Sequence, residues 1–158
     1  MNYRNENNIH LLDEQTQRLR YLIREMHDCC QDRMLYESNK FNLPQSELRC
    51  LMLFKGEKNL TAKEIAHKMD VAKSRVTKII TSLLKKGLVE RIDDPKDGRI
   101  KLISITTKGE KKIGEMESFI IEIHEKLMLQ LEPDVRERIL ENLEILRVAM
   151  EFVKGTFA

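Results

Sequence analysis

The most chemically distinctive part of this 158-residue chain is a block of basic residues between positions 71 and 112. The block carries 12 Lys/Arg and 5 Asp/Glu, whereas residues 1–70 are balanced and residues 113–158 hold 5 Lys/Arg against 10 Asp/Glu. The formal net charge of +2 therefore conceals one strongly positive segment. Such a concentration of positive charge is typical of a surface that binds a polyanion.

Within this block, small polar and basic side chains lie opposite an apolar stripe at helical spacing. A helix over about 73–86 would bury the stripe and leave the polar side to solvent. Arginine can pair with guanine through two hydrogen bonds in the major groove, and Lys or Ser can reach bases or phosphates. The stripe consists of Val76, Ile79, Ile80, Leu83 and Leu84. The predicted DNA-binding residues at the amino-terminal end of the helix are Lys73, Ser74, Arg75, Thr77 and Lys78.

A second group of charged side chains follows at a predicted hairpin tip. The sequence pattern predicts two strands, at 88–92 and 100–105. They flank the turn-rich residues 93–98, which include Pro95 and Gly98. Lys96 and Arg99 are placed to reach the DNA backbone or the minor groove, where the negative potential of narrow A/T tracts favours arginine.

Five further helices are expected to hold these two groups in place. Two precede the basic block, at about 10–38 and 44–55, and a third covers 61–69, where Thr61 and Glu64 form a capping box and carry no chemistry. A break at 70–71 separates that third helix from the one at 73–86, and Gly87 ends the latter. Two more helices start at Thr106 or Thr107 and at Pro133. The helices 61–69 and 73–86 form a helix-turn-helix, and the hairpin makes it a winged version.

The predicted fold class is mainly α with a small β-hairpin wing (α+β). A winged helix-turn-helix lobe at 39–107 lies between dimerisation helices at 1–38 and 108–158, all in one compact chain. The terminal helices carry apolar stripes that we expect to pack together and to supply a dimer interface. Their members are Leu12, Leu19, Leu22, Ile23, Met26, Cys30, Met34, Ile113, Met116, Ile120, Ile123, Leu127, Leu131, Val135, Ile139, Leu143, Leu146, Met150 and Val153.

This order of parts resembles the MarR (multiple-antibiotic-resistance regulator) family of winged helix-turn-helix transcription factors. The most specific segment is Asp97-Gly98-Arg99 followed by the alternating run from Ile100 to Gly109, in which Ile105 stands where the family usually has Leu. The segment from Val76 to Arg91 also looks like the family's recognition helix and first wing strand. The resemblance implies that Arg99 enters the minor groove and that Asp97 holds its guanidinium by a charge-assisted hydrogen bond.

The resulting prediction is a cytoplasmic bacterial transcriptional regulator that binds a pseudo-palindromic operator as a homodimer. Repression is the expected sign of regulation, because a dimer bound at a promoter blocks it. The resemblance further implies a small-molecule effector, aromatic or anionic, that releases the protein from DNA. Two alternatives stay open: an architectural DNA binder without sequence preference, and a protein-interaction module that has lost DNA binding.

The sequence offers little for catalysis, metal binding or membranes. It lacks the common nucleophile, phosphate-loop and metalloprotease motifs, so no enzyme activity and no cofactor are expected. The four histidines show no mutual ligand spacing, which predicts no metal site. No secretory signal is expected from the first residues, and the longest apolar run is five residues, so no membrane span is expected. Cys30 and Cys50 are expected to be buried, and redox activity of Cys29, Cys30 or Cys50 is left open.

Overall fold

The computed structural model describes the backbone of residues 3–157 and the side chains of residues 10–156. These residues group into two compact units, one that ends at Ile113 and one that begins at Gly114. The described chain contains six α-helices and a three-stranded antiparallel sheet, which confirms the predicted mainly helical α+β class. None of the described helices has a stretch that is both long and apolar enough to cross a membrane.

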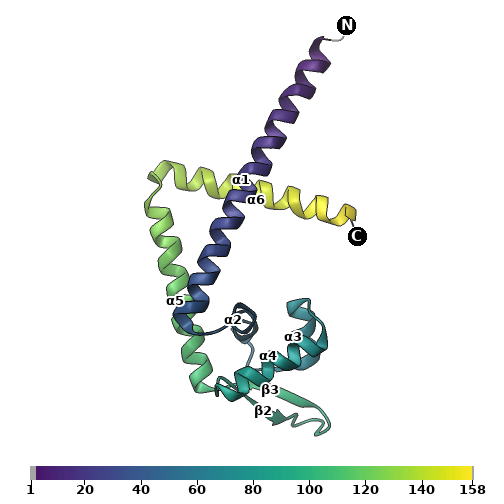
Figure 1. Cartoon of the computed structure of the whole chain (residues 1–158), viewed down its shortest axis with the longest axis vertical. Helices are drawn as coiled ribbons and strands as arrows, with labels where there is room; N and C mark the ends of the chain where they lie inside the picture. Colours follow the sequence, from purple (N-terminus) through teal and green to yellow (C-terminus); the bar gives the residue numbers. More distant parts are fainter. Residues whose placement is uncertain (1–2, 158) are drawn as a thin grey trace. The chain divides into compact units, whose positions relative to one another are not determined.

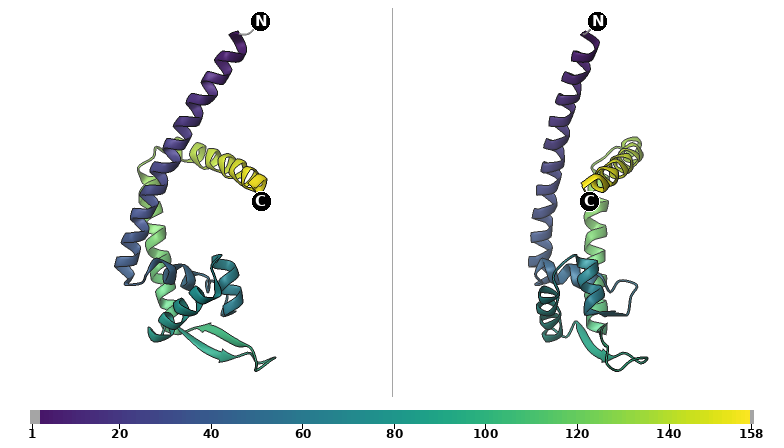
Figure 2. Two further views of the ribbon diagram at one scale, coloured as in Figure 1. Left: turned by 45° about the vertical axis from the view of Figure 1, so that its right-hand side comes forward. Right: turned by 90° about the vertical axis from the view of Figure 1, so that its right-hand side faces the viewer.

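Helix α1 runs from Tyr3 to Phe41 and is longer at both ends than the predicted range of 10–38. Figure 2 shows it as one continuous helix, and its 39 residues correspond to about 58 Å at 1.5 Å per residue. It ends where Asn42 adopts a φ of 51° and the Leu43 N–H donates to the Ser38 carbonyl at 3.1 Å. Large apolar side chains of the helix that are exposed among the described residues are Leu11, Leu12, Leu19, Tyr21, Leu22, Met26, Leu35 and Tyr36.

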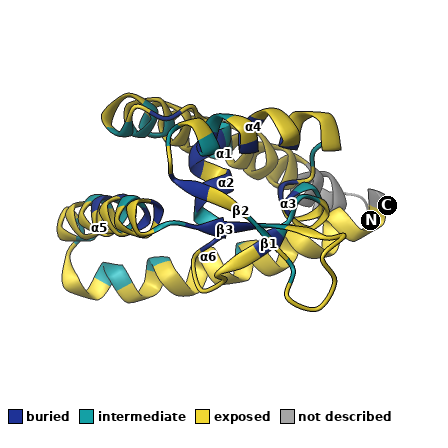
Figure 3. Ribbon diagram, turned by 90° about the horizontal axis from the view of Figure 1, so that it is seen from below, coloured by how far each residue is buried: buried dark blue, intermediate teal, exposed yellow. Residues whose placement is uncertain are grey.

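Three short helices form the centre of the first unit. They are α2 (Gln45–Met52), α3 (Ala62–Met69) and α4 (Lys73–Lys85). Helix α4 contacts both α2 and α3, and Figure 1 shows the three together above the hairpin. The side chains with no exposed surface lie on these helices and include Cys50, Leu51, Ile65, Val76 and Leu83. Figure 3 shows buried stretches on α3 and on the strands, whereas α6 is exposed along most of its length.

Helix α2 differs from its prediction at both ends. Pro44 was expected at the first helical position, but its ψ of 146° places it at the N-cap, one residue earlier. The helix then ends at Met52, and the chain continues as turns to Gly56, which has a φ of +78°. The predicted extension to Lys55 is therefore wrong, because the chain leaves the helix before that glycine.

The boundaries of α3 confirm two predicted turn signals. The Glu64 N–H donates to Thr61 Oγ1 at 3.2 Å and the Thr61 N–H donates to Glu64 Oε2 at 2.7 Å, which completes the capping box. At the other end Asp70 has a φ of 53°, and the Val71 N–H donates to the Ala66 carbonyl at 3.2 Å. The left-handed residue turns the chain sharply into α4, so the helix-turn-helix has its expected tight break.

The sheet contains one more strand than the sequence predicted. Strands β2 (Val89–Asp93) and β3 (Lys101–Ile105) form the expected hairpin, and β1 (Asn59–Thr61) pairs with the other side of β3. The strand order is β1-β3-β2, with buried Leu60 opposite Ile103. Strand β1 was missed because three residues are too few to show alternation, and its last residue also caps α3.

Helices α5 (Thr107–Leu129) and α6 (Pro133–Lys154) complete the chain, followed by a short 3₁₀ turn, Gly155–Phe157. Thr106 lies just before α5 and caps it, since its Oγ1 accepts a hydrogen bond from the Gly109 N–H at 3.1 Å. Pro133 is the first residue of α6, as predicted. No residue of α6 is buried.

Candidate nucleic-acid interface

Helix α4 has one side in the core of the first unit and one side in solvent. Val76, Ile79, Ile80 and Leu83 are buried, whereas Leu84, which was also assigned to the core, is half-buried. The five predicted DNA-binding positions all lie on the exposed side, within the first two turns. These are Lys73, Ser74, Arg75, Thr77 and Lys78.

The three cations on this surface have no acidic neighbour within the described part of the chain. Among the described residues, no carboxylate oxygen lies within 4.0 Å of the charged group of Lys73, Arg75 or Lys78. Several other basic residues of the chain do have such a partner, for example Lys68 with Glu57 at 2.6 Å. The charge at the amino-terminal end of α4 is thus free to bind an external anion.

The hairpin tip is shaped by two aspartates that bind backbone groups. Asp94 Oδ1 accepts from the Lys96 N–H at 2.8 Å, and Asp97 Oδ1 accepts from the Arg99 N–H at 3.0 Å. Both carboxylates therefore hold the turn, and the side chains of Lys96 and Arg99 are exposed. The expected contact of Asp97 with the Arg99 guanidinium is not what the structure shows, since this carboxylate binds the backbone N–H of the same residue.

The two predicted groups of DNA-binding residues belong to one compact unit. Helix α4 contacts β2, the first strand of the hairpin, and Figure 2 shows the loop of the hairpin standing out from this unit. Lys101 on β3 pairs with Asp93 on β2, which neutralises one cation at the base of the tip. Lys96 and Arg99 have no such partner among the described residues, so the free positive charge of the hairpin lies at its end.

An ion pair that the sequence did not predict fixes the carboxyl-terminal end of α4. Lys86 Nζ lies 2.6 Å from Glu47 Oε2 on α2, and this glutamate is buried. The Lys108 ammonium donates to the Lys86 carbonyl at 2.8 Å, which adds a bond from α5. The sequence did not indicate which residue pairs with Glu47, because Glu47 and Lys86 are 39 positions apart.

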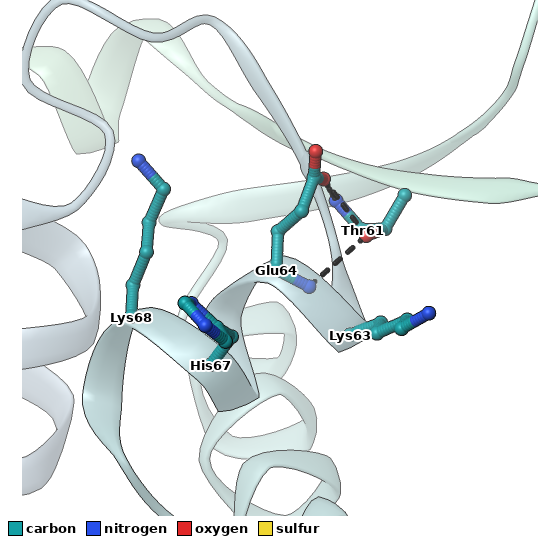
Figure 4. A pocket seen from close by; sticks show the side chains of 5 residues that line it. All are labelled: Thr61, Lys63, Glu64, His67 and Lys68. Atoms are coloured by element: carbon teal, nitrogen blue, oxygen red, sulfur yellow. Dashed lines mark hydrogen bonds between the residues drawn. The ribbon is translucent and has the colours of Figure 1, made fainter.

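A hollow of about 420 Å³ lies on the surface of α3, the first helix of the helix-turn-helix. Its lining residues are Thr61, Lys63, Glu64, His67 and Lys68 (Figure 4). Hydrogen bonds from the Thr61 backbone, and then from its side chain, hold the pKa of Glu64 below its ordinary value. Thr61 and Glu64 thus serve the helix cap, and no pair of acid and base is assembled there.

The cysteines differ in exposure from one another. Cys50 is fully buried, and burial together with the nearby Glu47 raises its pKa to about 12. Cys30 was predicted to be buried, but both Cys29 and Cys30 are exposed in the chain because this part of α1 has no neighbour that covers them within its own unit. No group of three or more His, Cys, Asp or Glu side chains in the described part of the chain could hold a metal ion.

Comparison with known proteins agrees with this architecture. The model of the MarR family matches residues 43–101. The HTH-type transcriptional regulator YfiV of Bacillus subtilis is 28% identical over 116 residues, which cover 73% of this chain and 72% of YfiV. The transcriptional repressor MdtR of the same organism is 33% identical over 86 residues, 54% of this chain and 56% of MdtR.

A solved structure gives the same fold. The complex of Staphylococcus aureus MepR with DNA superposes with a TM-score of 0.69 at 23% identity and covers 82% of this chain and 98% of MepR. The fold and the exposed end of α4 define a winged helix-turn-helix protein. Residues 43–101, which hold the helix-turn-helix and most of the hairpin, match the model of the MarR family, and the relatives YfiV and MdtR are transcriptional regulators.

Proposed function

We propose that this protein is a sequence-specific transcriptional repressor that binds double-stranded DNA as a homodimer. The observation that carries the proposal is the exposed amino-terminal end of α4, where Lys73, Arg75 and Lys78 have no acidic partner among the side chains that the structure describes. Free cations on the exposed side of a helix suit the major groove of B-DNA, which is wide enough to admit an α-helix.

In this proposal the exposed residues of α4 bind different parts of the DNA, according to the chemistry of their side chains. Arg75 reads a guanine through O6 and N7, because a planar guanidinium can donate two parallel hydrogen bonds. Lys73 and Lys78 bind phosphates, which contribute affinity that does not depend on sequence. Ser74 and Thr77 lie between these cations and face the base edges.

The hairpin is proposed to follow the neighbouring minor groove. Asp94 and Asp97 hold the tip through its backbone, so the loop is formed before it meets DNA. Lys96 and Arg99 are then presented as two exposed cations to a groove whose negative potential is strongest in A/T tracts.

Dimerisation is supported by the apolar surface of the terminal helices. Helix α6 is 22 residues long and has no buried residue. Its Leu143, Met150 and Val153 have 46%, 53% and 49% of their surface exposed. So much contiguous apolar surface is unusual for a monomer. A two-fold dimer places two copies of α4 in successive major grooves and predicts half-sites roughly 10 bp apart.

Repression follows from occupation of a promoter, and MdtR, one of the relatives, is a repressor. We also propose that a small aromatic or anionic effector releases the protein by favouring a dimer in which the two copies of α4 no longer fit the operator. A panel of such compounds tests this, with loss of operator affinity as the expected result for at least one compound. Unchanged affinity across the panel contradicts it.

The proposed function is tested by selecting bound duplexes from a random pool at 150 mM salt. An enriched inverted repeat is the expected result. Binding without enrichment would instead indicate an architectural DNA binder, and absence of binding would indicate a protein-interaction module. Each of these two outcomes contradicts sequence-specific regulation.

The affinities of protein variants for the selected operator then distinguish the role of α4 from that of the hairpin. Arg75→Ala should lose about 1–3 kcal/mol of discrimination at one base pair in each half-site. Arg99→Ala should weaken binding to all duplexes and reduce the salt dependence by about one phosphate contact per protomer. Arg18→Ala, which removes an exposed arginine of α1 outside both surfaces, is the charge-matched control.

A further inference from the structure

The outer side of α4 carries two threonines whose hydroxyl hydrogens are already in use. Thr77 Oγ1 donates to the Lys73 carbonyl at 3.0 Å, and Thr81 Oγ1 donates to the Thr77 carbonyl at 2.8 Å. Both side chains are exposed. A hydroxyl has a single hydrogen, so neither threonine can donate to a base while these bonds persist.

The groups that Thr77 still offers are a methyl group and the lone pairs of its oxygen. The internal hydrogen bond also restricts the side chain to a rotamer that keeps Oγ1 near the backbone, which fixes the direction of the methyl group before DNA is bound. The side chain is therefore a preformed apolar contact with an acceptor beside it.

These remaining groups match one kind of base pair. Both kinds of base pair offer an amino donor in the major groove, that of cytosine or of adenine, but only an A·T pair offers a methyl group, the 5-methyl group of thymine. We propose that Thr77 reads an A·T pair through contact of its γ-methyl group with the thymine 5-methyl group. This inference rests on the proposed function, since it requires α4 to lie in the major groove.

Thr77 suits this role better than its neighbours on α4. It lies in the second turn, near the end of the helix that a recognition helix inserts into the groove, whereas Thr81 lies a full turn further on. Ser74 has no methyl group, and Lys73, Arg75 and Lys78 carry charges that suit phosphate or guanine.

The test removes the same contact from each partner in turn. Each thymine of one operator half-site is replaced by deoxyuridine, which lacks only the methyl group, and dissociation constants are measured for three forms of the full chain. At one thymine, wild type should bind about fourfold more weakly after replacement, the effect of losing one buried methyl-sized group. Thr77→Val keeps a methyl group and should retain this ratio. Thr77→Ser keeps the hydroxyl but lacks the methyl group, and its ratio should fall to about one.

Thr81→Ser provides the matched control, because it removes a methyl group from the other internally bonded threonine of the helix. It should leave the ratio at that thymine unchanged. A Thr77→Ser variant that keeps the fourfold ratio, or a wild type that tolerates every replacement, overturns the inference. Failure of wild type to bind the unmodified operator would instead refute the proposed function, so the two failures are distinguishable.

Discussion

Gly109 is held where no larger side chain fits. A Cβ atom at this position would lie 2.1 Å from the Leu88 carbonyl oxygen and 2.4 Å from Ile105 Cδ1. The first turn of α5 therefore approaches the backbone beside β2, and a glycine is required for close packing rather than for its φ angle. The Leu88 carbonyl cannot move freely, because it accepts a hydrogen bond from the Thr106 N–H at 3.2 Å.

Gly109→Ala should lower the free energy of unfolding by about 1–3 kcal/mol or more, the usual cost of overpacking. Gly114→Ala is the control, since the same helix has open space around Gly114. That change should raise the free energy of unfolding by about 0.5–1 kcal/mol through helix propensity. Urea denaturation measures both, and equal signs for the two variants would contradict the packing argument.

Cys50 is a buried thiol that resists ionisation. Its pKa is raised from 9.0 to about 12, so the folded chain binds this proton more tightly than the unfolded chain between those pH values. The stability that the neutral thiol contributes is complete below pH 9 and is lost as the pH rises above that value.

The difference in unfolding free energy between wild type and Cys50→Ala should therefore shrink by about 1.4 kcal/mol between neutral pH and pH 10. Denaturation curves at both pH values measure it, in a background where Cys29 and Cys30 are replaced by serine. A difference that stays constant would show that Cys50 ionises as readily in the folded chain as in the unfolded one.

The exposure and contacts of a residue could be predicted from the sequence where a single helix or turn determines them. The exposure of Arg75 and Lys78 follows from the apolar stripe of α4 alone. The partner of the Asp97 carboxylate did not follow, because a backbone N–H two residues away competes with the guanidinium that the sequence suggested. The exposure of Cys30 was misjudged because a stripe on a long helix does not say which of its turns are covered.

At the scale of elements, the position of α4 depends on contacts at both of its ends. The capping box of α3 and the left-handed Asp70 determine the turn that precedes α4. The local sequence predicted both the capping box and the break at this turn. The sequence did not predict the ion pair of Glu47 with Lys86, and it did not predict strand β1. Each depends on chain segments that meet only in the folded molecule.

The ion pair of Glu47 and Lys86 should be measurable as a coupling energy. Glu47→Lys alone and Lys86→Glu alone each place like charges together at a partly buried site and should cost about 1–3 kcal/mol of unfolding free energy. The double variant Glu47→Lys/Lys86→Glu restores opposite charges and should recover at least about 1 kcal/mol of the summed loss. Urea denaturation of the four forms gives the cycle, and additive losses would mean that the pair contributes nothing.

At the scale of the whole molecule, the exposed apolar residues of α6 have the spacing of a helix-packing seam. Ile139, Leu143, Leu146, Met150 and Val153 alternate at steps of four and three residues, the pattern of two helices that pack along their length. Ile139 and Leu146 are half-exposed and the other three are exposed, so this seam is available to a second copy of the chain.

Leu143→Glu should raise the dissociation constant of the dimer tenfold or more, because a carboxylate without a partner is costly in an apolar interface. Ile145→Glu changes an exposed apolar residue on another side of the same helix and should have little effect. Sedimentation equilibrium measures both variants. A monomeric wild type, or equal effects of the two substitutions, would exclude this seam as the dimer interface.

In the proposed complex, two copies of α4 enter two major grooves on the same side of the DNA. The most direct measurement compares dissociation constants for three duplexes: the selected operator, the operator with one half-site scrambled, and the operator with five base pairs inserted between its half-sites. Five base pairs are about half a helical turn, so the insertion moves the half-sites to opposite sides of the duplex. The insertion should therefore weaken binding about as much as scrambling a half-site. Equal affinity for all three duplexes would contradict it.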